Sequence, residues 1–327
     1  MASEELNLPI IDLSPYLHPQ NDTDKAKVVS QVRDACAKYG FFQVSGHGIP
    51  LHLQNGLLQA IGKFFHQDKE AKMKLSFLEN RGRRGYEASG MSVRDGDKLP
   101  DSKESFYIGR EEPEFEAPGF HCPNQWPETL PREEFRDPVW EYYQETDKLG
   151  RTIWEILLLG LGRDPTAVME QFTKRPIVQM KMIRYPPGSA TLPEQFGVGA
   201  HTDFGGVTVL LQQANRSGLQ VYLDSLQTWI SVPALEDIYV INCGDMIAQW
   251  SGGIYRSARH RVINASVDEE RLSCATFWHG DADATNPLDE GGVRDTVGKL
   301  LMQRFKGQFS IPREVVEAAG RLGKVGA

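Results

Sequence analysis

Seven short runs of β-branched and aromatic residues, all between positions 176 and 282, constrain the fold of this chain more than any other feature. They are VQMKMIRYPP, GVTVLLQQ, GLQVYL, TWISVP, YVINCGD, HRVINAS and RLSCATFW, and turn residues separate them. Such regularly spaced short strands with Gly-rich turns are typical of an antiparallel β domain. We expect residues 176–282 to form a jelly-roll core (a double-stranded β-helix), which can enclose a ligand cavity between its two sheets.

The first 115 residues are richer in helix signals. Apolar residues at helical spacing predict one helix over 22–39, ended by Gly40, and a second over about 53–65. The run at 40–49 predicts a short β segment between them, whereas the Gly, Pro and charge in 80–135 favour long surface loops.

Later helix signals complete the outline. The pairs Asp137-Pro138 and Asp164-Pro165 each combine an N-cap residue with a first-turn proline, and they predict helices that begin there. Residues 293–321 are expected to be helical, with one helix around 295–306. Because no repeat, linker or low-complexity segment interrupts residues 1–327, we predict a single compact α+β unit. It would comprise a helix-rich N-terminal cap (1–115), the core (176–282) and C-terminal helices.

Charge and cysteine content exclude some classes of protein. The 36 basic and 44 acidic residues give a net charge of -8, which argues against a nucleic-acid partner. The densest basic cluster, Arg81, Arg83 and Arg84, is expected to be a solvated turn rather than a contact to an anionic substrate. Four widely spaced cysteines suggest reduced thiols. No stretch resembles a secretory leader or a membrane span, so we expect a cytoplasmic protein with no membrane partner.

The segment HTDFGG contains a candidate metal site. On a strand, His201 and Asp203 would point to the same face, and His260 in the run RHRVI could supply a third ligand from a neighbouring strand. Two histidines and one aspartate are the facial triad of non-haem Fe(II) enzymes, which leaves three metal positions open. The HxD pattern alone is weak, because His201 and Asp203 could cap a turn and His260 could be an ordinary core histidine.

Arg271 and Ser273 strengthen the metal interpretation. They follow the charged turn VDEE, so a hairpin would bring them beside His260, and their spacing places both on one face. An inward guanidinium beside a hydroxyl suits a carboxylate or phosphate ligand, since a lone buried charge is costly. The same alternation puts Phe277 and His279 on that face. Phe277 could form a cavity wall or simply pack in the core, and His279 is expected to be a pocket polar group or a surface residue.

With these motifs in place, the chain resembles the iron(II)/2-oxoglutarate-dependent dioxygenases of the isopenicillin N synthase-like superfamily. The resemblance covers nearly the whole chain. It rests on LPIIDLSPYL, ACAKYGFFQVSGHGIP, RRGYEASG and KESFYIG near the N-terminus, and on HTDFGGVTVLLQ, GLQV, VINCGD, YRSARHRV and RLSCATF in the core.

The resemblance implies roles for individual residues. His201, Asp203 and His260 match the iron ligands, and Arg271 with Ser273 match the pair that binds the remote carboxylate of 2-oxoglutarate. Tyr185 matches a tyrosine that adds a hydroxyl to that site, although Ile183 stands where many relatives carry Asn, so Tyr185 could instead face the substrate.

Weaker candidates for the substrate pocket are Tyr86, which resembles a residue near the active-site mouth, and Phe204. Tyr86 could equally have a purely structural role. By strand parity Phe204 and Trp278 would point away from the metal into the core, and His47 is interpreted as a turn residue.

The function implied is oxidation of a small organic molecule, such as a specialised metabolite, with Fe(II), 2-oxoglutarate and O2. Hydroxylation, desaturation and ring formation are all compatible outcomes. Two alternatives remain at this stage: an iron oxidase or cyclase that uses Arg271 and Ser273 to bind the substrate's own carboxylate without 2-oxoglutarate, and a metal-binding sensor without turnover.

Overall fold

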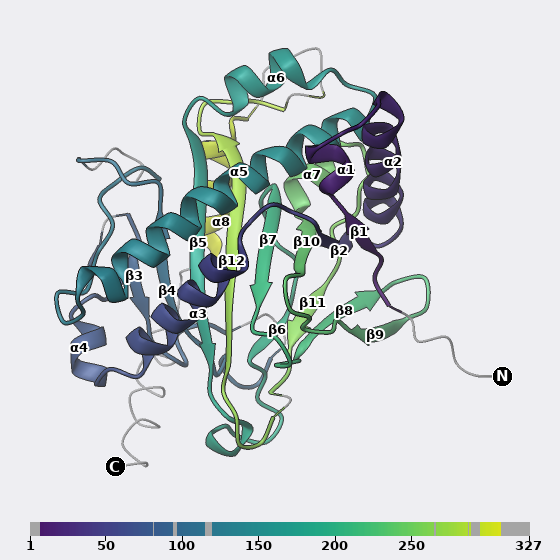
Figure 1. Cartoon of the computed structure of the whole chain (residues 1–327). Coiled ribbons are helices and arrows are strands. Elements are labelled where there is room, and N and C mark those ends of the chain that lie inside the picture. The colour runs from purple at the N-terminus through teal and green to yellow at the C-terminus, as the bar shows by residue number, and fades with distance from the viewer. Residues whose placement is uncertain are drawn as a thin grey trace.

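Two β-sheets face each other at the centre of the molecule (Figure 1). The computed structural model describes residues 7–80, 82–93, 97–114, 120–264, 266–286, 288 and 295–308. The large sheet has eight strands in the order β1-β2-β10-β7-β12-β5-β4-β3, and the small sheet has four in the order β6-β11-β8-β9. All pairs are antiparallel except β1 with β2.

The strands of the large sheet are β1 (Ile10–Asp12), β2 (Phe41–Ser45), β3 (Gly85–Glu87), β4 (Glu104–Gly109), β5 (Pro176–Tyr185), β7 (Val207–Gln212), β10 (Tyr239–Cys243) and β12 (Arg271–Asp281). Those of the small sheet are β6 (Val198–His201), β8 (Leu219–Leu223), β9 (Thr228–Ser231) and β11 (His260–Val262). The seven predicted runs are all strands, and the predicted α+β jelly-roll class is confirmed. Strand β6 lies outside these seven runs; the sequence placed His201 on a strand, and β6 ends at that residue.

The helices are α1 (Ser14–Leu17), α2 (Asp22–Lys38), α3 (Leu51–Phe65), α4 (Lys69–Met73), α5 (Arg136–Gly160), α6 (Pro165–Phe172), α7 (Asp245–Trp250) and α8 (Val297–Gln308), with 3-10 turns at Arg132–Glu134 and Gly188–Ala190. The predicted helices over 22–39, 53–65 and 295–306 are confirmed; residues 309–321 of the predicted C-terminal helical region lie outside the described residues. None of the described helices combines the length and apolar composition needed to cross a bilayer.

The two predicted helix caps had different outcomes. Asp164 caps α6 as expected, because its carboxylate accepts a hydrogen bond from the Thr166 amide at 2.9 Å. The prediction for Asp137 was wrong: α5 begins at Arg136, two residues before the predicted start at Pro138, and Phe135 occupies the N-cap position without a side-chain cap. Asp137 lies inside the first turn and pairs with Arg132 at 2.6 Å, so its signal marked an ion pair rather than a boundary.

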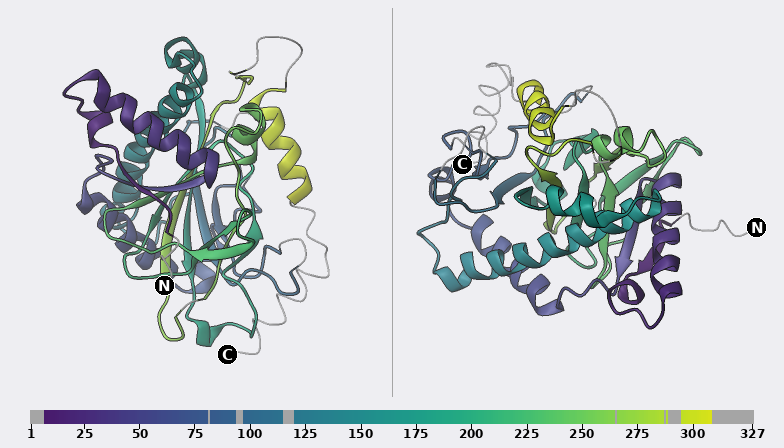
Figure 2. Two further views of the ribbon diagram at one scale, coloured as in Figure 1. Left: turned by 90° about the vertical axis from the view of Figure 1, so that its right-hand side faces the viewer. Right: turned by 90° about the horizontal axis from the view of Figure 1, so that it is seen from above.

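Helices α3 and α5 cross one face of the large sheet, which we call the outer face (Figures 1 and 2). Two buried indoles anchor this contact, since Trp154 Nε1 on α5 donates to the Trp278 carbonyl at 3.2 Å. The approach depends on Gly150, because a Cβ there would lie 2.6 Å from the Trp278 ring. Trp278 therefore packs in the core, as its parity predicted.

The opposite, inner face of the large sheet meets the small sheet. Ile183 and Tyr185 of β5 share a buried apolar cluster with Val198, Leu219 and Val262 of the small sheet. Side chains alternate along each strand, so the register assigns every strand residue to one of these two faces. Arg271 and Ser273 lie opposite Tyr185 and Ile183 and therefore belong to the inner face.

The prediction of long surface loops over 80–135 was wrong in part, because β3 and β4 lie there and extend the large sheet beyond β5. The first 115 residues thus supply four strands, β1 to β4, as well as helices. The solvated-turn interpretation also fails for Arg84, which is buried and donates to the Phe120 carbonyl at 2.7 Å. Arg83 is half-buried, and Arg81 lies outside the described residues. Charged residues suggested solvent here, whereas the Arg84 side chain makes a buried polar contact.

Candidate metal centre and anion site

His201, Asp203 and His260 converge at one end of the small sheet. Strands β6 and β11 pair with His201 directly opposite His260. The two Nε2 atoms lie 3.8 and 3.7 Å from Asp203 Oδ1, and one ligand atom from each residue lies within 4.8 Å of the others. The predicted meeting of these three side chains is therefore confirmed as geometry.

The reason for the convergence differs from the prediction for Asp203. Strand β6 ends at His201, so strand alternation does not carry the argument to residue 203. Instead, Asp203 lies in a tight loop that Asp245 holds. The Asp203 carbonyl accepts from the Asp245 amide at 2.7 Å, and the Thr202 hydroxyl donates to the Asp245 carboxylate at 2.9 Å. The N-terminal residue of helix α7 thus holds the loop that aims Asp203 at the two histidines.

Backbone carbonyls fix both imidazole rings. His201 Nδ1 lies 2.9 Å from the Gly199 carbonyl, and His260 Nδ1 lies 3.2 Å from that of Ala258. Since a carbonyl can only accept, each Nδ1 carries a ring hydrogen, which leaves each Nε2 as the nitrogen that can bind a metal. Histidines that bind metals commonly have their other ring nitrogen held in this way.

Two polar side chains of the large sheet fix the Asp203 carboxylate. Thr208 Oγ1 and Asn242 Nδ2 both donate to Oδ2, at 2.6 and 2.8 Å. The register places Thr208 of β7 opposite Asn242 of β10, so one pair of neighbouring strands supplies both donors. With Oδ2 so engaged, Oδ1 is the oxygen turned toward the histidines.

These residues fit a non-haem Fe(II) ion. Two neutral imidazole nitrogens and one carboxylate oxygen form the set that leaves three positions open on this metal. The rings are oriented by backbone contacts and the carboxylate by two donors, so the ligands need little rearrangement to bind. The edge-to-face contact of His260 with Phe41, at 5.2 Å between ring centroids, adds an apolar wall.

Arg271 and Ser273 lie on the inner face of β12, but the predicted hairpin beside His260 was wrong. Strand β12 pairs with β5 and β7 of the large sheet, whereas β11 pairs with β6 and β8 of the small one. The turn containing VDEE therefore crosses from one sheet to the other. The two residues approach the metal centre by facing the small sheet, not by pairing with His260.

Arg271 is buried, and within the described part of the chain its hydrogen bonds go to neutral groups. Its guanidinium donates to the Arg216 carbonyl at 3.1 Å, to Gln212 Oε1 at 2.9 Å and to Ser273 Oγ at 3.4 Å. The Tyr185 ring stacks below it, with 4.7 Å from the guanidinium carbon to the ring centroid. Burial lowers the pKa of Arg271 from its ordinary value. Among the described residues no carboxylate pairs with this guanidinium, so an anionic ligand suits it well.

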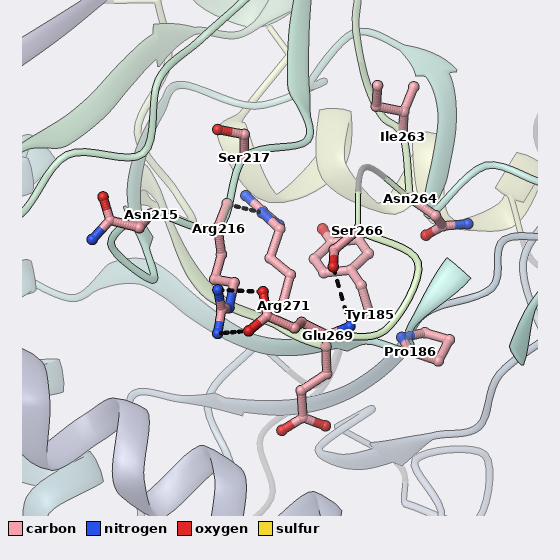
Figure 3. Close-up of a pocket in the computed structure, with 11 residues that line it drawn as sticks. Tyr185, Pro186, Asn215, Arg216, Ser217, Ile263, Asn264, Ser266, Glu269 and Arg271 are labelled. Atoms are coloured by element: carbon pink, nitrogen blue, oxygen red, sulfur yellow. Dashed lines mark hydrogen bonds and ion pairs between the residues drawn. The ribbon is translucent and has the colours of Figure 1, made fainter. Parts of the chain in front are cut away.

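A cavity of about 180 Å³ is lined by Arg271 and by residues of the β7–β8 and β11–β12 turns (Figure 3). An ion pair between Arg216 and Glu269, at 2.6 Å, joins these two turns beside it. Tyr185 also lines the cavity, as does Asn264. The triad residues do not line this cavity, so it is a feature of the Arg271 end of the site.

Phe277 and His279 both lie close to the metal centre. Phe277 is half-buried on the inner face and pairs with Thr208 across the β12–β7 register. His279 is buried rather than at the surface, and its Nδ1 accepts from the Gly206 amide at 3.2 Å while its ring stacks on Phe277. Burial lowers the pKa of His279 to about 4, so the ring is neutral near pH 7.

Two predicted pocket residues lie elsewhere. Tyr86 of β3 is on the outer face, where its ring packs against Phe64 of α3 and its hydroxyl donates to Glu104 at 2.6 Å. Phe204 packs against the hydrophobic core cluster that includes Trp154 and Trp278. Both Tyr86 and Phe204 therefore have the structural packing role that the sequence also allowed, rather than a place in the substrate pocket. His47 is a buried turn residue that accepts from the Ile49 amide at 3.1 Å.

Sequence reasoning missed Thr208, Asn242 and Gln212. All three lie in motifs that were recognised, HTDFGGVTVLLQ and VINCGD, but their partners are set by which strands pair. The available signal was a polar residue inside an apolar strand. It indicates that a buried partner exists without saying which.

Comparisons with known proteins agree with this geometry. Residues 8–129 match the family model described as non-haem dioxygenase in morphine synthesis N-terminal, and residues 177–280 match that of the 2OG-Fe(II) oxygenase superfamily. The chain is 62% identical to the 2-oxoglutarate-dependent dioxygenase thnC of Trichoderma harzianum, over 98% of this chain and 100% of that one. It is 42% identical to the 2-oxoglutarate-dependent dioxygenase caaD of Aspergillus niger, covering 95% and 97% of the two chains.

A solved structure shows the same architecture. The crystal structure of a full-length Neurospora crassa protein in complex with alpha-KG superposes with a TM-score of 0.80 at 25% identity, covering 94% of this chain and 98% of that chain.

Proposed function

Because the chain belongs to the 2OG-Fe(II) oxygenase superfamily, we propose that His201, Asp203 and His260 bind its iron, and that Arg271 and Ser273 bind the remote carboxylate of 2-oxoglutarate. The observation that carries this assignment is one arrangement: three converging ligand atoms, with a buried guanidinium that has no carboxylate partner among the described residues. Tyr185 is assigned to the same anion site, since its ring lies under the Arg271 guanidinium.

The protein is a 2-oxoglutarate-dependent dioxygenase that uses Fe(II), 2-oxoglutarate and O2. When bound, the metal and cosubstrate supply the oxidising chemistry. The protein's own contribution is to hold and orient the reactants. Asp203 and the two imidazoles would hold the iron, Arg271 would bind the far end of the cosubstrate, and the apolar residues between the sheets would exclude water.

The two alternatives considered from sequence are less well supported. The relatives that cover nearly the whole chain are named as 2-oxoglutarate-dependent enzymes, which disfavours an oxidase that needs no 2-oxoglutarate. A sensor without turnover would not need the combination of oriented iron ligands and an anion site. Coupled measurement of oxygen uptake and succinate release tests both alternatives, because each predicts no succinate.

The substrate is proposed to be a small organic molecule, in the class of specialised metabolites, that is hydroxylated, desaturated or cyclised. Support comes from an active site enclosed between two sheets and from relatives that share the whole length of the chain. The net charge of -8 supports the absence of a nucleic-acid partner. Four free, buried thiols support a reducing compartment such as the cytoplasm.

We also propose that residues 1–327 form one unit in which residues 1–115 cap the catalytic core at 176–282 and the region 293–321 closes the C-terminal side. Family models that match at 8–129 and 177–280 support the first two parts. The described part of the third is α8.

Replacing Arg271 tests the anion-site assignment. In the anaerobic protein, adding Fe(II) and then 2-oxoglutarate should produce a weak visible charge-transfer band. Arg271→Leu removes a charged partner and should weaken 2-oxoglutarate binding by about 2–5 kcal/mol. Arg271→Lys retains the positive charge but lacks the two-pronged guanidinium, so its affinity for 2-oxoglutarate should lie between those of the wild type and Arg271→Leu. Iron binding should be unchanged in both, and an unchanged affinity for 2-oxoglutarate in Arg271→Leu would contradict the assignment.

A further inference from the structure

The inner face of the large sheet is not covered uniformly, and the uncovered part marks where a substrate can lie. On β4, β5, β7 and β12, the last counted as far as Phe277, every inner-face position is buried except five. The half-buried exceptions form a group that we call the floor: Tyr107, Gln179, Lys181, Leu210 and Phe277.

The strand register makes the floor continuous and places it beside the metal centre. Tyr107 is opposite Lys181, and Gln179 is opposite Phe277. Ala275 lies between Lys181 on one side and Leu210 on the other. Phe277 in turn pairs with Thr208, the residue whose hydroxyl donates to Asp203.

The floor has an apolar end and a charged end. Phe277 and Leu210 lie at the end near Asp203, whereas Lys181 lies on the far side of β12. Two strand spacings of about 4.8 Å and a two-residue step of about 6.8 Å separate the backbones of Thr208 and Lys181, or roughly 12 Å in all. A small molecule over Phe277 can therefore approach the metal centre at one end and the Lys181 ammonium at the other.

Lys181 is held ready for a ligand by its neighbours. Its ammonium lies 3.4 Å from Glu87 and 4.8 Å from the centroid of the Tyr107 ring. The same Glu87 oxygen accepts from Lys103 at 3.1 Å and from the Tyr107 hydroxyl at 2.9 Å, so its charge is shared among several donors. The Lys103 side chain is 2% exposed and that of Lys181 is 12%, which makes Lys181 the ammonium that a molecule on the floor can reach.

Resting on the function proposed above, we infer that Lys181 binds an acidic oxygen of the primary substrate and so selects an anionic small molecule with an apolar body. An ammonium that has lost most of its water gains more from an anionic oxygen than from a neutral one. The ammonium of Lys is a compact charge and lacks the two-pronged geometry of the Arg guanidinium, so it suits a single carboxylate oxygen. Phe277 and Leu210 pack against the body of the substrate, and the bond to be oxidised lies over the end nearest Asp203.

Matched pairs of probes test this inference. Simple aromatic and aliphatic carboxylates such as 3-phenylpropionate, 4-hydroxybenzoate and hexanoate, each with its primary amide, are titrated into the Fe(II) protein at saturating 2-oxoglutarate. Saturation occupies Arg271, so the probes cannot bind there. The readouts are the perturbation of the visible band and the stimulation of succinate formation. In the wild-type protein we expect the best carboxylates to bind at least tenfold more tightly than their amides.

Variants assign that preference to Lys181. Lys181→Met should reduce the acid-to-amide ratio to near one, and Lys181→Arg should restore most of it. Lys148→Met, which removes an equal charge from an exposed position on α5, should leave the ratio unchanged. The inference is overturned if no carboxylate in the panel binds more tightly than its amide, or if Lys181→Met keeps the wild-type ratio. Failure of the wild-type protein to form the band with Fe(II) and 2-oxoglutarate would instead refute the proposed function, so the two failures are distinguishable.

Discussion

Replacing Thr208 with Val isolates the contribution of a single hydrogen bond to iron binding. The two side chains have nearly the same shape, and Thr208 is buried, so the main change is loss of the 2.6 Å bond from its hydroxyl to Asp203 Oδ2. Asn242 remains as the other donor to that oxygen. The carboxylate then loses one of the two contacts that turn Oδ1 toward the histidines.

The expected cost follows from the charge on the acceptor. A hydrogen bond to an ionised carboxylate contributes about 1.5–3 kcal/mol, and losing a partner of a metal ligand typically weakens metal binding by about 10- to 100-fold. At about 1.4 kcal/mol for each factor of ten, this is roughly 1.4–2.8 kcal/mol. Because both donors act on one oxygen, the combined loss in Thr208→Val with Asn242→Leu should differ from the sum of the single losses.

The assay is an anaerobic calorimetric titration of Fe(II) into the apoprotein, with thermal unfolding of the apo forms as a measure of folding. Thr208→Ser is the matched control, since it keeps the hydroxyl and should bind iron nearly as tightly as the wild type. If Thr208→Val folds normally and binds Fe(II) with wild-type affinity, then the hydrogen bonds to Oδ2 do not orient the ligand, and the reasoning is refuted.

Three further predictions concern stability and reactivity. Gly150→Ala places a Cβ 2.6 Å from the Trp278 ring and should destabilise the fold by about 1–3 kcal/mol in urea unfolding; an unchanged midpoint would mean that α5 moves away without cost. Burial raises the pKa of Glu87, but Lys103 and Lys181 outweigh it and hold that pKa well below its ordinary value. The ionised Glu87 carboxylate therefore stabilises the folded protein above a pH of about 4.3, and this stabilisation is lost as the pH falls through the lower folded-state pKa. The urea midpoints of Glu87→Gln and the wild type should then converge in acid, and a constant gap between them would contradict this. Burial also raises the pKa values of Cys36 and Cys274, and all four thiols are buried, so a disulfide reagent at pH 8 should label them only as fast as the protein unfolds; a thiol that reacts at once would contradict their inert environment.

The sequence predicted those features that depend on local pattern. Helical periodicity identified α2 and α3, and alternation identified β12, the strand that supplies both Arg271 and Phe277. It failed where long-range pairing decides the outcome. The turn before Arg271 suggested a hairpin, but its two flanking strands, β11 and β12, lie in different sheets. Arg84 and Glu87 suggested a solvated loop, because a single sequence does not reveal the buried Phe120 carbonyl that accepts from Arg84 or the Lys103 ammonium that pairs with Glu87.

The same reasoning explains why the iron ligands were predictable and the substrate contacts were not. A metal site needs particular residue types, so His201, Asp203 and His260 are distinctive wherever the fold brings them together. Alternation places Ser273, Ala275 and Phe277 on one face without ranking them, and only Phe277 of these three remains half-buried. Lys181 shares the spacing of Gln179 and Ile183, and its meaning comes from the strands on either side and from the Glu87 carboxylate of β3. Substrate selectivity in this fold therefore depends on which inner-face positions the small sheet and loops leave uncovered. Relatives with identical iron ligands can then differ in substrate through one such position, and residue 181 is where we expect that difference to be largest.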